Sequence, residues 1–490
     1  MNKPLRRVAV FCGLLVLALL IRVNYVQFVT GDELANDKHN RRVSINQFAQ
    51  PRGDIIVDGK SLTGSVETPG SDFKYKATFK DGPMWAPVTG YASQAYQTTF
   101  LEGVYDKFLT GNDDRLFFNR TIDMLTGKEK QGGKVITTLN AKAQLAAFTG
   151  LGNKKGAVAA LDPRTGAILA LASTPSYDPS SFAGSSTKTD QKNWLALQKA
   201  NNPDDPMLNR ALRQVYPPGS TFKVVTAAAA LENSDISKIT DIDAPTDSPL
   251  PYKLPLSSKN LENEGDLPCK NASLRVALKV SCNTVFGHIG EVLKKDKMRE
   301  QAEKFGFNQE IMTPVRADAS VYSKEMDAPG NVLSAIGQYN TAATPLQMAM
   351  VAAAIANDGK LMQPYMVDKL QAPNLNVIEQ TKPHEFSQPV SAANAQKLQQ
   401  MMETVVKEGT GTNAQIDGVT VGGKTGTAQN GVGNSKNPYA WFISYAKTAD
   451  GSPVAVAVVV EDSDASRGDI SGGGLAAPIA KKVMEAVLNK

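Results

Sequence analysis

The sequence predicts an α+β protein made of a membrane anchor, a small N-terminal domain and a larger domain with a central antiparallel sheet flanked by helices. Two patterns lead to this prediction. A long apolar run follows basic residues near the start of the chain, and strand-like segments at both ends of residues 134–490 enclose a series of helical segments. Strands from the two ends of one domain commonly pair in a single sheet that the intervening helices cover. The expected boundaries are residues 1–29 for the anchor, 30–133 for the small domain and 134–490 for the larger domain.

The composition is that of an ordinary globular protein. Of the 490 residues, 42% are hydrophobic and 21% are charged, and this length allows roughly two to three domains. The formal net charge is +5, and the basic residues are scattered along the chain. A nucleic-acid-binding surface normally requires a dense basic patch, so nucleic acid is not an expected partner.

The anchor is predicted from one apolar run. Residues 8–21 are apolar without a break, Arg22 interrupts them, and residues 23–29 continue the apolar character. With Arg22 snorkelling toward the interface, the run reaches the roughly 20 residues that a membrane-spanning helix needs. A cleaved signal peptide is the alternative, but no small-x-small cleavage site follows the run. The basic residues that precede it are Lys3, Arg6 and Arg7. Because such residues stay on the cytoplasmic side, we expect a single-pass protein with a cytoplasmic N-terminus and an extracellular remainder.

Residues 30–133 carry no motif associated with catalysis. After a polar stretch, residues 51–59 alternate apolar residues with turn formers, which predicts a short strand and a turn. The rest of this region mixes glycine, proline, aspartate and aromatic residues, a pattern typical of short strands with a few helices. We therefore expect the small domain to give structural support.

The larger domain begins with alternating strand and helix patterns. Residues 134–139 predict a strand, and Asn140 is placed to cap the helix that follows at residues 141–151. Two further strands, separated by a Pro- and Gly-containing turn at residues 162–166, predict a hairpin. The other expected strands are residues 156–161, 167–173, 440–446 and 454–460, and the other expected helices are residues 221–231, 274–293, 345–356 and 478–488.

Cysteine and histidine are too scarce for several kinds of site. The three cysteines include no CxxC pair, and none of the three histidines has a partner at metal-ligand spacing. We therefore expect no metal, no cofactor and no histidine-based catalysis. Cys12 lies in the apolar run and is expected to be inert, whereas Cys269 and Cys282 are either a disulfide or two buried thiols.

Ser220 and Lys223 form the first pair of residues with catalytic chemistry. Residues 216–219 read Tyr-Pro-Pro-Gly, which stops any preceding element, and an apolar helix starts at Ser220. Backbone N–H groups at a helix start favour developing negative charge, and Lys223 lies one turn later on the same face. A neutral lysine could take the serine proton, and burial beside a second cation would lower its pKa for that role. The alternative is a capping serine followed by a surface lysine.

Ser281, Cys282 and Asn283 interrupt the helical segment that begins at residue 274. A hydroxyl and an amide two residues apart can both face a cleft when they lie on a turn between helices. Helix capping or a buried polar turn is the alternative, and this motif taken alone favours the alternative.

Residues 424–429 read Lys-Thr-Gly-Thr-Ala-Gln and follow an apolar stretch, which predicts an edge strand that feeds a hairpin. Gly426 has no side chain, so a substrate backbone could approach and pair with this strand. Lys424 offers a cation, and Thr425 and Thr427 offer hydroxyls for a carboxylate. An exposed polar strand with solvated charges is the alternative.

The three motifs in this order, Ser-x-x-Lys, Ser-x-Asn and Lys-Thr-Gly, are the signature of penicillin-binding proteins and serine β-lactamases. Over nearly its full length the chain resembles a class B penicillin-binding protein, a peptidoglycan D,D-transpeptidase, and is most like the actinobacterial penicillin-binding protein A group. The other stretches that carry the resemblance are Gln-Pro-Arg-Gly-Asp-Ile at 50–55, Ala-Leu-Asp-Pro-Arg-Thr-Gly at 160–166, Ile-Gly-Gln at 336–338 and Thr-Pro-Leu-Gln-Met at 344–348. The resemblance implies a penicillin-binding transpeptidase fold for the larger domain and a function in cell-wall synthesis, cell division and cell shape.

The resemblance also implies a role for each motif residue. Ser220 would attack the penultimate D-Ala carbonyl of a donor stem peptide, Lys223 would be the general base, and Ser281 would carry a proton to the leaving amine. Backbone N–H groups of Ser220 and Thr427 would form the oxyanion hole. The implied substrate-binding residues are Asn283, which would also orient Lys223, Lys424, Thr425, Gly426 and Thr427. A β-lactam would acylate Ser220 and stay attached.

Two residues depart from the usual pattern of this family. The middle residue of the second motif is Cys282, and a disulfide with Cys269 would brace the loop that carries Ser281 and Asn283. Tyr439, just before residues 440–442, stands where many relatives carry histidine.

Other serine enzymes and a non-enzyme share parts of this pattern. A β-lactamase needs a deacylating base, and no Glu-x-x-Leu-Asn-like segment lies between Asn283 and Lys424. A bifunctional class A enzyme needs a glycosyltransferase domain, for which residues 30–133 are too few. A D,D-carboxypeptidase, which uses water as the acceptor, stays open. A non-catalytic β-lactam sensor or division scaffold also stays open, although the intact motifs argue against it.

The expected partners follow from the resemblance. Peptidoglycan stem peptides ending in D-Ala-D-Ala and β-lactam antibiotics would bind at Ser220. The small domain, similar to the dimerisation domains of the family, would be a pedestal that lifts the site from the membrane. It would contact a polytopic glycosyltransferase of the shape, elongation, division and sporulation (SEDS) type and other division proteins.

Overall fold

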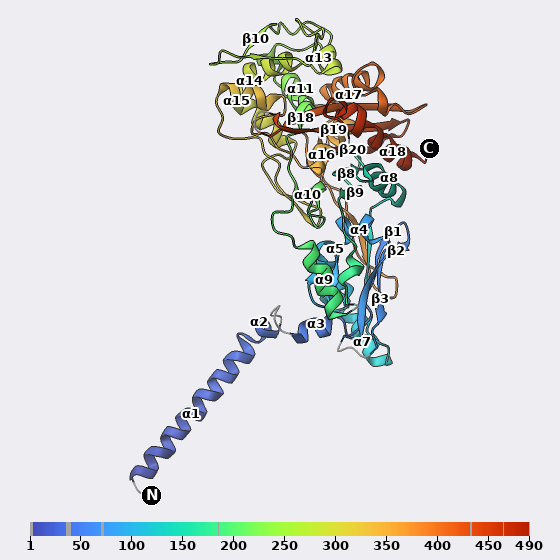
Figure 1. The fold of residues 1–490 in the computed structure, drawn as a ribbon. Coiled ribbons are helices and arrows are strands. Elements are labelled where there is room, and N and C mark those ends of the chain that lie inside the picture. Colours follow the sequence, from blue (N-terminus) through green and yellow to red (C-terminus); the bar gives the residue numbers. More distant parts are fainter. Residues whose placement is uncertain are drawn as a thin grey trace.

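The computed structural model describes residues 3–35, 41–69, 73–184, 186–431, 434–463 and 465–489. Figure 1 shows a long N-terminal helix joined to an elongated body, in which a narrow N-terminal domain carries a broader C-terminal domain at its far end.

The long helix, α1 (Lys3–Phe28), matches the predicted anchor. It continues through Arg22 without a break, and none of its residues is buried in the protein. An 18-residue window of α1 has a mean hydropathy of 2.2, which makes the helix long and apolar enough to cross a membrane. Arg22 lies over the Tyr25 ring, 5.5 Å from its centroid. Within the described part of the chain, α1 is the one candidate membrane-spanning helix, and α2 (Gly31–Ala35) and α3 (Arg41–Gln47) lead from it to the small domain.

The small domain, called the pedestal below, combines short strands with short helices. Its strands are β1 (Ile55–Val57), β2 (Lys60–Ser61), β3 (Thr63–Glu67), β4 (Tyr75–Phe79), β5 (Ala92–Ser93) and β6 (Gln97–Thr98). Its helices are α4 (Gly82–Thr89), α5 (Phe100–Val104), α6 (Asp106–Leu109) and α7 (Phe117–Thr126).

A five-stranded sheet joins the pedestal to the larger domain. Its order is β16-β15-β7-β1-β2, where β7 is Lys134–Thr137, β15 is Val367–Gln371 and β16 is Val377–Gln380. β7 pairs in parallel with β1 and antiparallel with β15. Strands from both sides of the predicted boundary at residue 133 thus share one sheet, so the two domains are not separated by a free linker.

Arg52, in the stretch at residues 50–55, organises the helices of the pedestal. Its buried guanidinium donates from Nε to Glu102 Oε2 at 2.6 Å and from Nη1 to Asp106 Oδ1 at 2.7 Å. A third bond runs from Nη2 to the backbone oxygen of Glu102 at 2.8 Å. A buried charge is tolerated when it is paired and hydrogen-bonded in this way, so Arg52 joins α5 and α6 to the strands.

The larger domain contains the predicted antiparallel sheet. Its order is β18-β19-β20-β8-β9, and every neighbouring pair is antiparallel. The strands are β8 (Lys155–Leu161), β9 (Ile168–Thr174), β18 (Thr420–Asn430), β19 (Lys436–Thr448) and β20 (Gly451–Asp462). Strands from the two ends of the domain meet at β20 and β8, which confirms the expected fold class.

Helices cover both faces of this sheet, so its strands are buried on both sides. On β8, Val158 packs into a cluster with α8 (Ala141–Leu151) and α18 (Ala477–Leu488). The next residue, Ala159, packs into the main core with α11 (Lys223–Glu232) and α16 (Pro345–Ala356). Successive side chains of a strand point to opposite faces, which explains why β8 and β20 are continuous runs of alanine and valine.

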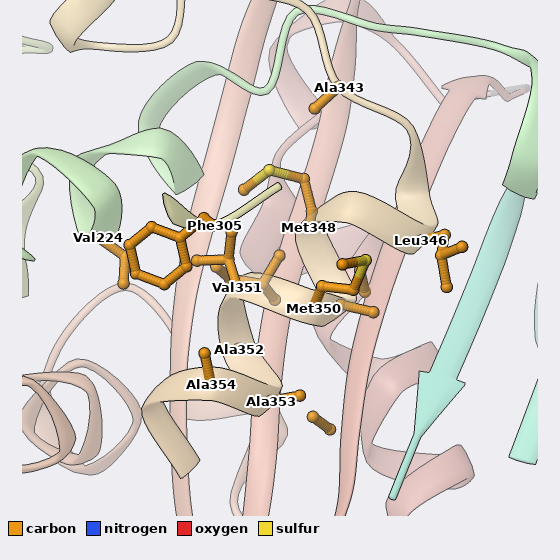
Figure 2. Packing of buried hydrophobic residues seen from close by; sticks show 14 of the residues in the cluster. Val224, Phe305, Ala343, Leu346, Met348, Met350, Val351, Ala352, Ala353 and Ala354 are labelled. Carbon is orange, nitrogen blue, oxygen red and sulfur yellow. The ribbon is translucent and has the colours of Figure 1, made fainter. Parts of the chain in front are cut away.

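The helix α16 fills the centre of the main core. Residues 345–355 are all buried, and Thr344 caps the helix by accepting a hydrogen bond from Gln347 N. Figure 2 shows its side chains, among them Met348 and Val351, gathered with Val224 of α11 and Phe305. This packing fixes α11, the helix that begins with Lys223, against the sheet.

Candidate active site

Ser220 lies on a short turn in front of α11. Residues 219–222 form a 3-10 turn, and α11 begins at Lys223, whereas the sequence predicted one helix at residues 221–231. The Ser220 side chain is partly exposed. Gly219 has a φ of +52°, a backbone conformation that glycine adopts without strain. The serine is therefore presented at the surface of the core while the rest of the turn is buried.

A second glycine braces the turn from the other side. Gly219 N donates to the Gly337 oxygen at 2.9 Å, and a Cβ on Gly337 would lie only 2.1 Å from the Gly219 oxygen. The Ile-Gly-Gln stretch at residues 336–338 thus positions the turn that carries Ser220. In the sequence this stretch carries only part of a resemblance, and the contact with Gly219 is not predictable from it.

The amine of Lys223 is completely buried and points at the second motif. Its Nζ donates to the backbone oxygen of Ser281 at 2.7 Å and to Asn283 Oδ1 at 2.7 Å, and lies 3.1 Å from Ser281 Oγ. A neutral amine has two N–H donors and one lone pair. The two short contacts use both donors, which leaves the lone pair free to accept a proton.

Ser281 stands between two lysines. Lys424 Nζ donates to Ser281 Oγ at 3.0 Å and to the Thr425 oxygen at 2.8 Å. Lys424 is as fully buried as Lys223. The single hydroxyl of Ser281 therefore connects the two amines, and its one proton can go to only one of them.

The two buried lysines have lowered pKa values. Burial lowers the pKa of Lys424 to about 7. Burial also lowers the pKa of Lys223 well below its ordinary value, and the positive charge of Lys424 lowers it further. The exposed carboxylate of Glu264 acts in the opposite direction on both pKa values. The charge of Lys424 therefore favours a neutral Lys223.

The second motif lies between α13 (Leu274–Val280) and α14 (Asn283–Lys304), which together replace the single helical segment at residues 274–293. Ser281 has a left-handed backbone with φ of +67°, and Cys282 N donates to the Ala277 oxygen at 2.8 Å. Asn283 then begins α14. This sharp break between the helices directs both Ser281 and Asn283 toward Lys223.

A loop at residues 262–269 is attached to the second motif at three points. Asn283 Nδ2 donates to the Glu262 oxygen at 2.8 Å, and Thr284 N donates to Asn263 Oδ1 at 3.1 Å. A disulfide joins Cys269 to Cys282. These three ties hold the loop, and with it Glu264, beside the lysine pair. Sequence reasoning missed Glu264, since nothing in the local pattern places this loop over the site.

Replacing both disulfide cysteines by alanine is expected to weaken this attachment. The free energy of unfolding should fall by about 3 kcal/mol, because the bond closes a short loop of the unfolded chain. Acylation by penicillin should also slow, because Asn283 loses a fixed neighbour. Denaturant unfolding and labelled-penicillin kinetics of the double variant Cys269→Ala, Cys282→Ala measure both effects. The matched control is Cys12→Ala, since Cys12 has no disulfide partner. Wild-type stability in the double variant would contradict this prediction.

The third motif lies on β18, the edge strand of the sheet, as the sequence predicted. A Cβ on Gly426 would lie 3.0 Å from the Pro218 oxygen and 3.0 Å from Thr221 Cγ2. On the face where a side chain would point, the turn that carries Ser220 therefore packs against Gly426, and the pairing of a substrate backbone with this edge strand stays a prediction. Because Gly426 has no side chain, that turn can pack directly against the strand that carries Lys424.

The two threonines of the motif have different surroundings. Thr425 is buried, and its Oγ1 lies 2.6 Å from Thr410 Oγ1. Thr427 is partly exposed. Tyr439, the departure from the family pattern, packs edge-on against Tyr216 with ring centroids 5.3 Å apart. It therefore forms part of the wall behind the nucleophile turn.

The arrangement combines groups that acyl transfer through a serine requires. The Lys223 amine, the Ser281 hydroxyl and the Lys424 amine converge on one place, and the partly exposed Ser220 precedes Lys223 by one helical turn in the chain. Among the residues that the structure describes, no group of three or more His, Cys, Asp or Glu side chains could hold a metal ion. Such a set suits nucleophilic catalysis through a serine ester.

Two protein families match separate parts of the chain. The penicillin binding protein transpeptidase domain family matches residues 156–485, and the penicillin binding protein A dimerisation domain family matches residues 52–135. The chain is 39% identical to the peptidoglycan D,D-transpeptidase PbpA of Mycolicibacterium smegmatis, over 100% of both chains. It is also 39% identical to the protein of the same name from Mycobacterium tuberculosis, over 100% of this chain and 99% of that one.

Solved structures give the same result. The chain is similar to penicillin-binding protein A from Mycobacterium tuberculosis in its penicillin G acyl-enzyme complex, with a TM-score of 0.82 and 39% identity, over 90% of this chain and 100% of that one. The ceftriaxone acyl-enzyme complex of the same protein gives a TM-score of 0.83 and 38% identity, over 91% and 100%. A D,D-transpeptidase domain from Eggerthella lenta gives a TM-score of 0.75 and 32% identity, over 90% of this chain and 98% of that one.

Proposed function

The chain belongs to the penicillin-binding protein family of peptidoglycan D,D-transpeptidases, and from this premise we propose that Ser220 is its nucleophile and Lys223 the base that activates it. The observation that carries the proposal is the complete burial of the Lys223 amine beside a second cation. Burial favours a neutral amine, which can accept a proton, one turn away from a partly exposed serine hydroxyl.

The first step forms the ester. Ser220 Oγ attacks the penultimate D-Ala carbonyl of a donor stem peptide, and the hydroxyl proton passes to Lys223 Nζ. The carbonyl oxygen becomes an oxyanion, held by the backbone N–H groups of Ser220 and Thr427. Losing one such donor typically raises the barrier by ~3–4 kcal/mol. Lys424 adds positive potential, and the hydroxyls of Thr425 and Thr427 bind the terminal carboxylate.

The second step releases the terminal D-Ala. The peptide C–N bond breaks, and the leaving nitrogen needs one proton to depart as an amine. Lys223 holds that proton, and Ser281 Oγ lies 3.1 Å from Lys223 Nζ. We assign Ser281 the transfer of this proton to the leaving amine, while Asn283 holds Lys223 and the donor amide in place. Lys223 returns to its neutral form as the acyl-enzyme is completed.

In the third step an amine of a second stem peptide attacks the ester carbonyl. The ester bond breaks, and the amine proton returns to Ser220 Oγ by way of Ser281 and Lys223. The new amide bond is the cross-link. A β-lactam acylates Ser220 in the same way, but its leaving group stays attached and blocks the acceptor. The related penicillin-binding protein A from Mycobacterium tuberculosis was solved as acyl-enzymes of penicillin G and ceftriaxone.

Product analysis tests transfer to an amine against transfer to water. We expect purified full-length protein, incubated with a donor peptide ending in D-Ala-D-Ala and an acceptor peptide with a free side-chain amine, to yield the cross-linked amide and free D-Ala. Mass spectrometry of the peptides identifies the products. Omitting the acceptor is the control for hydrolysis. If the shortened, hydrolysed donor were the only product at saturating acceptor, the protein would be a D,D-carboxypeptidase.

The position at the membrane is a further part of the proposal. The basic residues at the start of α1, among them Lys3, favour a cytoplasmic N-terminus and an extracellular catalytic domain. Family resemblance supports the pedestal as the contact for a SEDS-type glycosyltransferase and other division proteins. Co-purification of such a partner that survives deletion of residues 30–133 would count against that contact.

A further inference from the structure

The helix α7 of the pedestal turns its apolar side chains toward solvent. None of its residues is buried. Phe118, Met124 and Leu125 are 79%, 75% and 78% exposed. The apolar side of a surface helix normally faces the core of its domain, so the orientation of α7 is the reverse of the usual one.

The exposed apolar residues share one side of the helix. At about 100° per residue, Phe118, Ile122 and Leu125 fall on a common face. Asn119 and Asp123 fall on the opposite side and are partly buried. The helix therefore carries partly buried polar side chains away from an apolar stripe that is left uncovered. An apolar stripe that is left exposed on the surface of the pedestal is a candidate interaction surface.

The position of α7 indicates what covers the stripe. Figure 1 shows α7 at the end of the pedestal to which α2 and α3 lead from α1, away from the sheet that carries the active site. Gln47, the last residue of α3, donates from Nε2 to Asp106 Oδ2 of α6 at 3.0 Å. The segment that leaves α1 is thus docked on the part of the pedestal that directly precedes α7 in the chain.

We propose that this apolar face of α7 inserts into the boundary between headgroups and acyl chains of the lipid bilayer that α1 enters. Phe118, Ile122 and Leu125 form this face, and the exposed side chains of Phe117 and Met124 flank it on one side. An amphipathic helix of this kind lies in the plane of the membrane surface. Because α1 keeps α7 close to the bilayer at high effective concentration, the insertion of a few side chains is sufficient.

The second attachment has a consequence for the active site. One spanning helix alone leaves the body free to tilt about its linker. A second contact at α7 fixes the tilt of the pedestal, and with it the height and direction in which Ser220 faces the cell wall. This inference rests on α1 being a membrane anchor, and it is independent of the chemistry at Ser220.

A second copy of the chain is the main competing occupant, because the matched dimerisation domain family spans α7. Stable protein interfaces bury about 1,200–2,000 Å² in total. One helix of ten residues covers well below that area. The reversed polarity of the helix and its place near the anchor favour lipid.

A fluorescence experiment on the full-length protein tests the proposal. With Cys12→Ser as the background, Leu125→Cys is labelled with an environment-sensitive fluorophore, and the protein is reconstituted into vesicles of phosphatidylcholine and phosphatidylglycerol. The matched control is Leu256→Cys, because Leu256 is 92% exposed and follows β10 (Tyr252–Lys253), which lies at the opposite end of the body in Figure 1. Lipids that carry a quencher near the headgroup report contact with the bilayer.

We expect the quencher lipids to lower the fluorescence at position 125 by about twofold or more, since an inserted side chain lies at the quencher's depth, and to leave position 256 unchanged. Equal, negligible quenching at both positions would overturn the proposal. A blue-shifted emission at position 125 that depends on protein density and resists the quencher lipids would assign the stripe to a second copy. Labelled penicillin, applied to the same vesicles, reports the active site separately, and flotation of the vesicles reports the anchor.

Discussion

Replacing Ser220 by alanine should abolish covalent labelling of the protein by penicillin. We expect the acylation rate to fall by roughly 10⁴-fold or more, because the variant has no hydroxyl to form the ester while its base remains in place. Mass spectrometry of the intact protein after exposure to penicillin G measures the effect. The wild type should gain the mass of one drug molecule, and the variant should gain none. Because Ser220 is partly exposed, the variant should keep the wild-type unfolding temperature.

The matched control is Ser281→Ala. It removes a hydroxyl that lies close to both lysines but leaves the nucleophile in place. We expect this variant to be acylated slowly, with the drug on the peptide that contains Ser220. Drug bound to Ser220→Ala, or a modified wild-type peptide that contains Ser281 and not Ser220, would show that the nucleophile is assigned to the wrong serine.

The sheet could be predicted because its strands are local runs of apolar residues, and the motifs could be predicted because they follow one another in a fixed order. β8 and β20 are runs of small and branched apolar residues, and such runs arise where a strand is buried on both faces. The three motifs are individually weak, but their order along the chain is restrictive. The break at Ser281 was visible as an interruption in a helical pattern, and the structure places it between α13 and α14.

The remaining features depend on contacts between distant segments. The pedestal sheet pairs Val135 with Ile55 and also with Leu370, and no local pattern identifies such partners. Glu264 lies in a loop whose position is set by the ties to Asn283, Thr284 and Cys282, all of which belong to another element. The reason for Gly426 was also not predictable, since the neighbouring turn becomes visible only when the sheet and α11 are packed together.

Replacing Lys223 by methionine tests the base directly. The side chain is fully buried, and methionine fills a similar volume without an amine. We expect acylation to slow by roughly 10²–10⁴-fold, the usual contribution of a general base. Stability should fall by no more than about 1–3 kcal/mol, because methionine no longer donates to the Ser281 oxygen and Asn283 Oδ1, while removal of a buried ionisable group acts in the opposite direction. A large loss of thermal stability in Lys223→Met would mean that the lysine is structural.

The stability of this variant should also respond differently to pH. In the unfolded chain a lysine keeps its proton up to its ordinary pKa of 10.5, whereas the folded pKa of Lys223 is lowered. Between these two values the unfolded state binds more protons, so the stability of the wild type rises with pH. Lys223→Met should lose the part of this rise that belongs to Lys223. Thermal unfolding measured across this pH range checks the sign.

The pH profile of acylation separates the two lysines. The reaction needs a neutral Lys223 and a charged Lys424, so the rate should rise as the pair loses its first proton and fall as it loses the second, near pH 7, since burial lowers the pKa of Lys424 to about 7. Lys424→Arg keeps its charge at all accessible pH values. The Lys424→Arg variant should therefore show the falling limb of the profile at higher pH and the rising limb at its wild-type position.

Glu264→Gln provides the most specific form of this test. The carboxylate raises the pKa of both lysines, so its removal should lower both pKa values and shift both limbs of the profile toward lower pH. Glu262→Gln is the matched control, because Glu262 is an exposed carboxylate of the same loop that contributes its backbone oxygen to Asn283. A purely structural role of the loop would change the rate and leave the limbs in place. Only an electrostatic role displaces them, so a profile that keeps its position in Glu264→Gln would contradict the assignment of both limbs to the lysine pair.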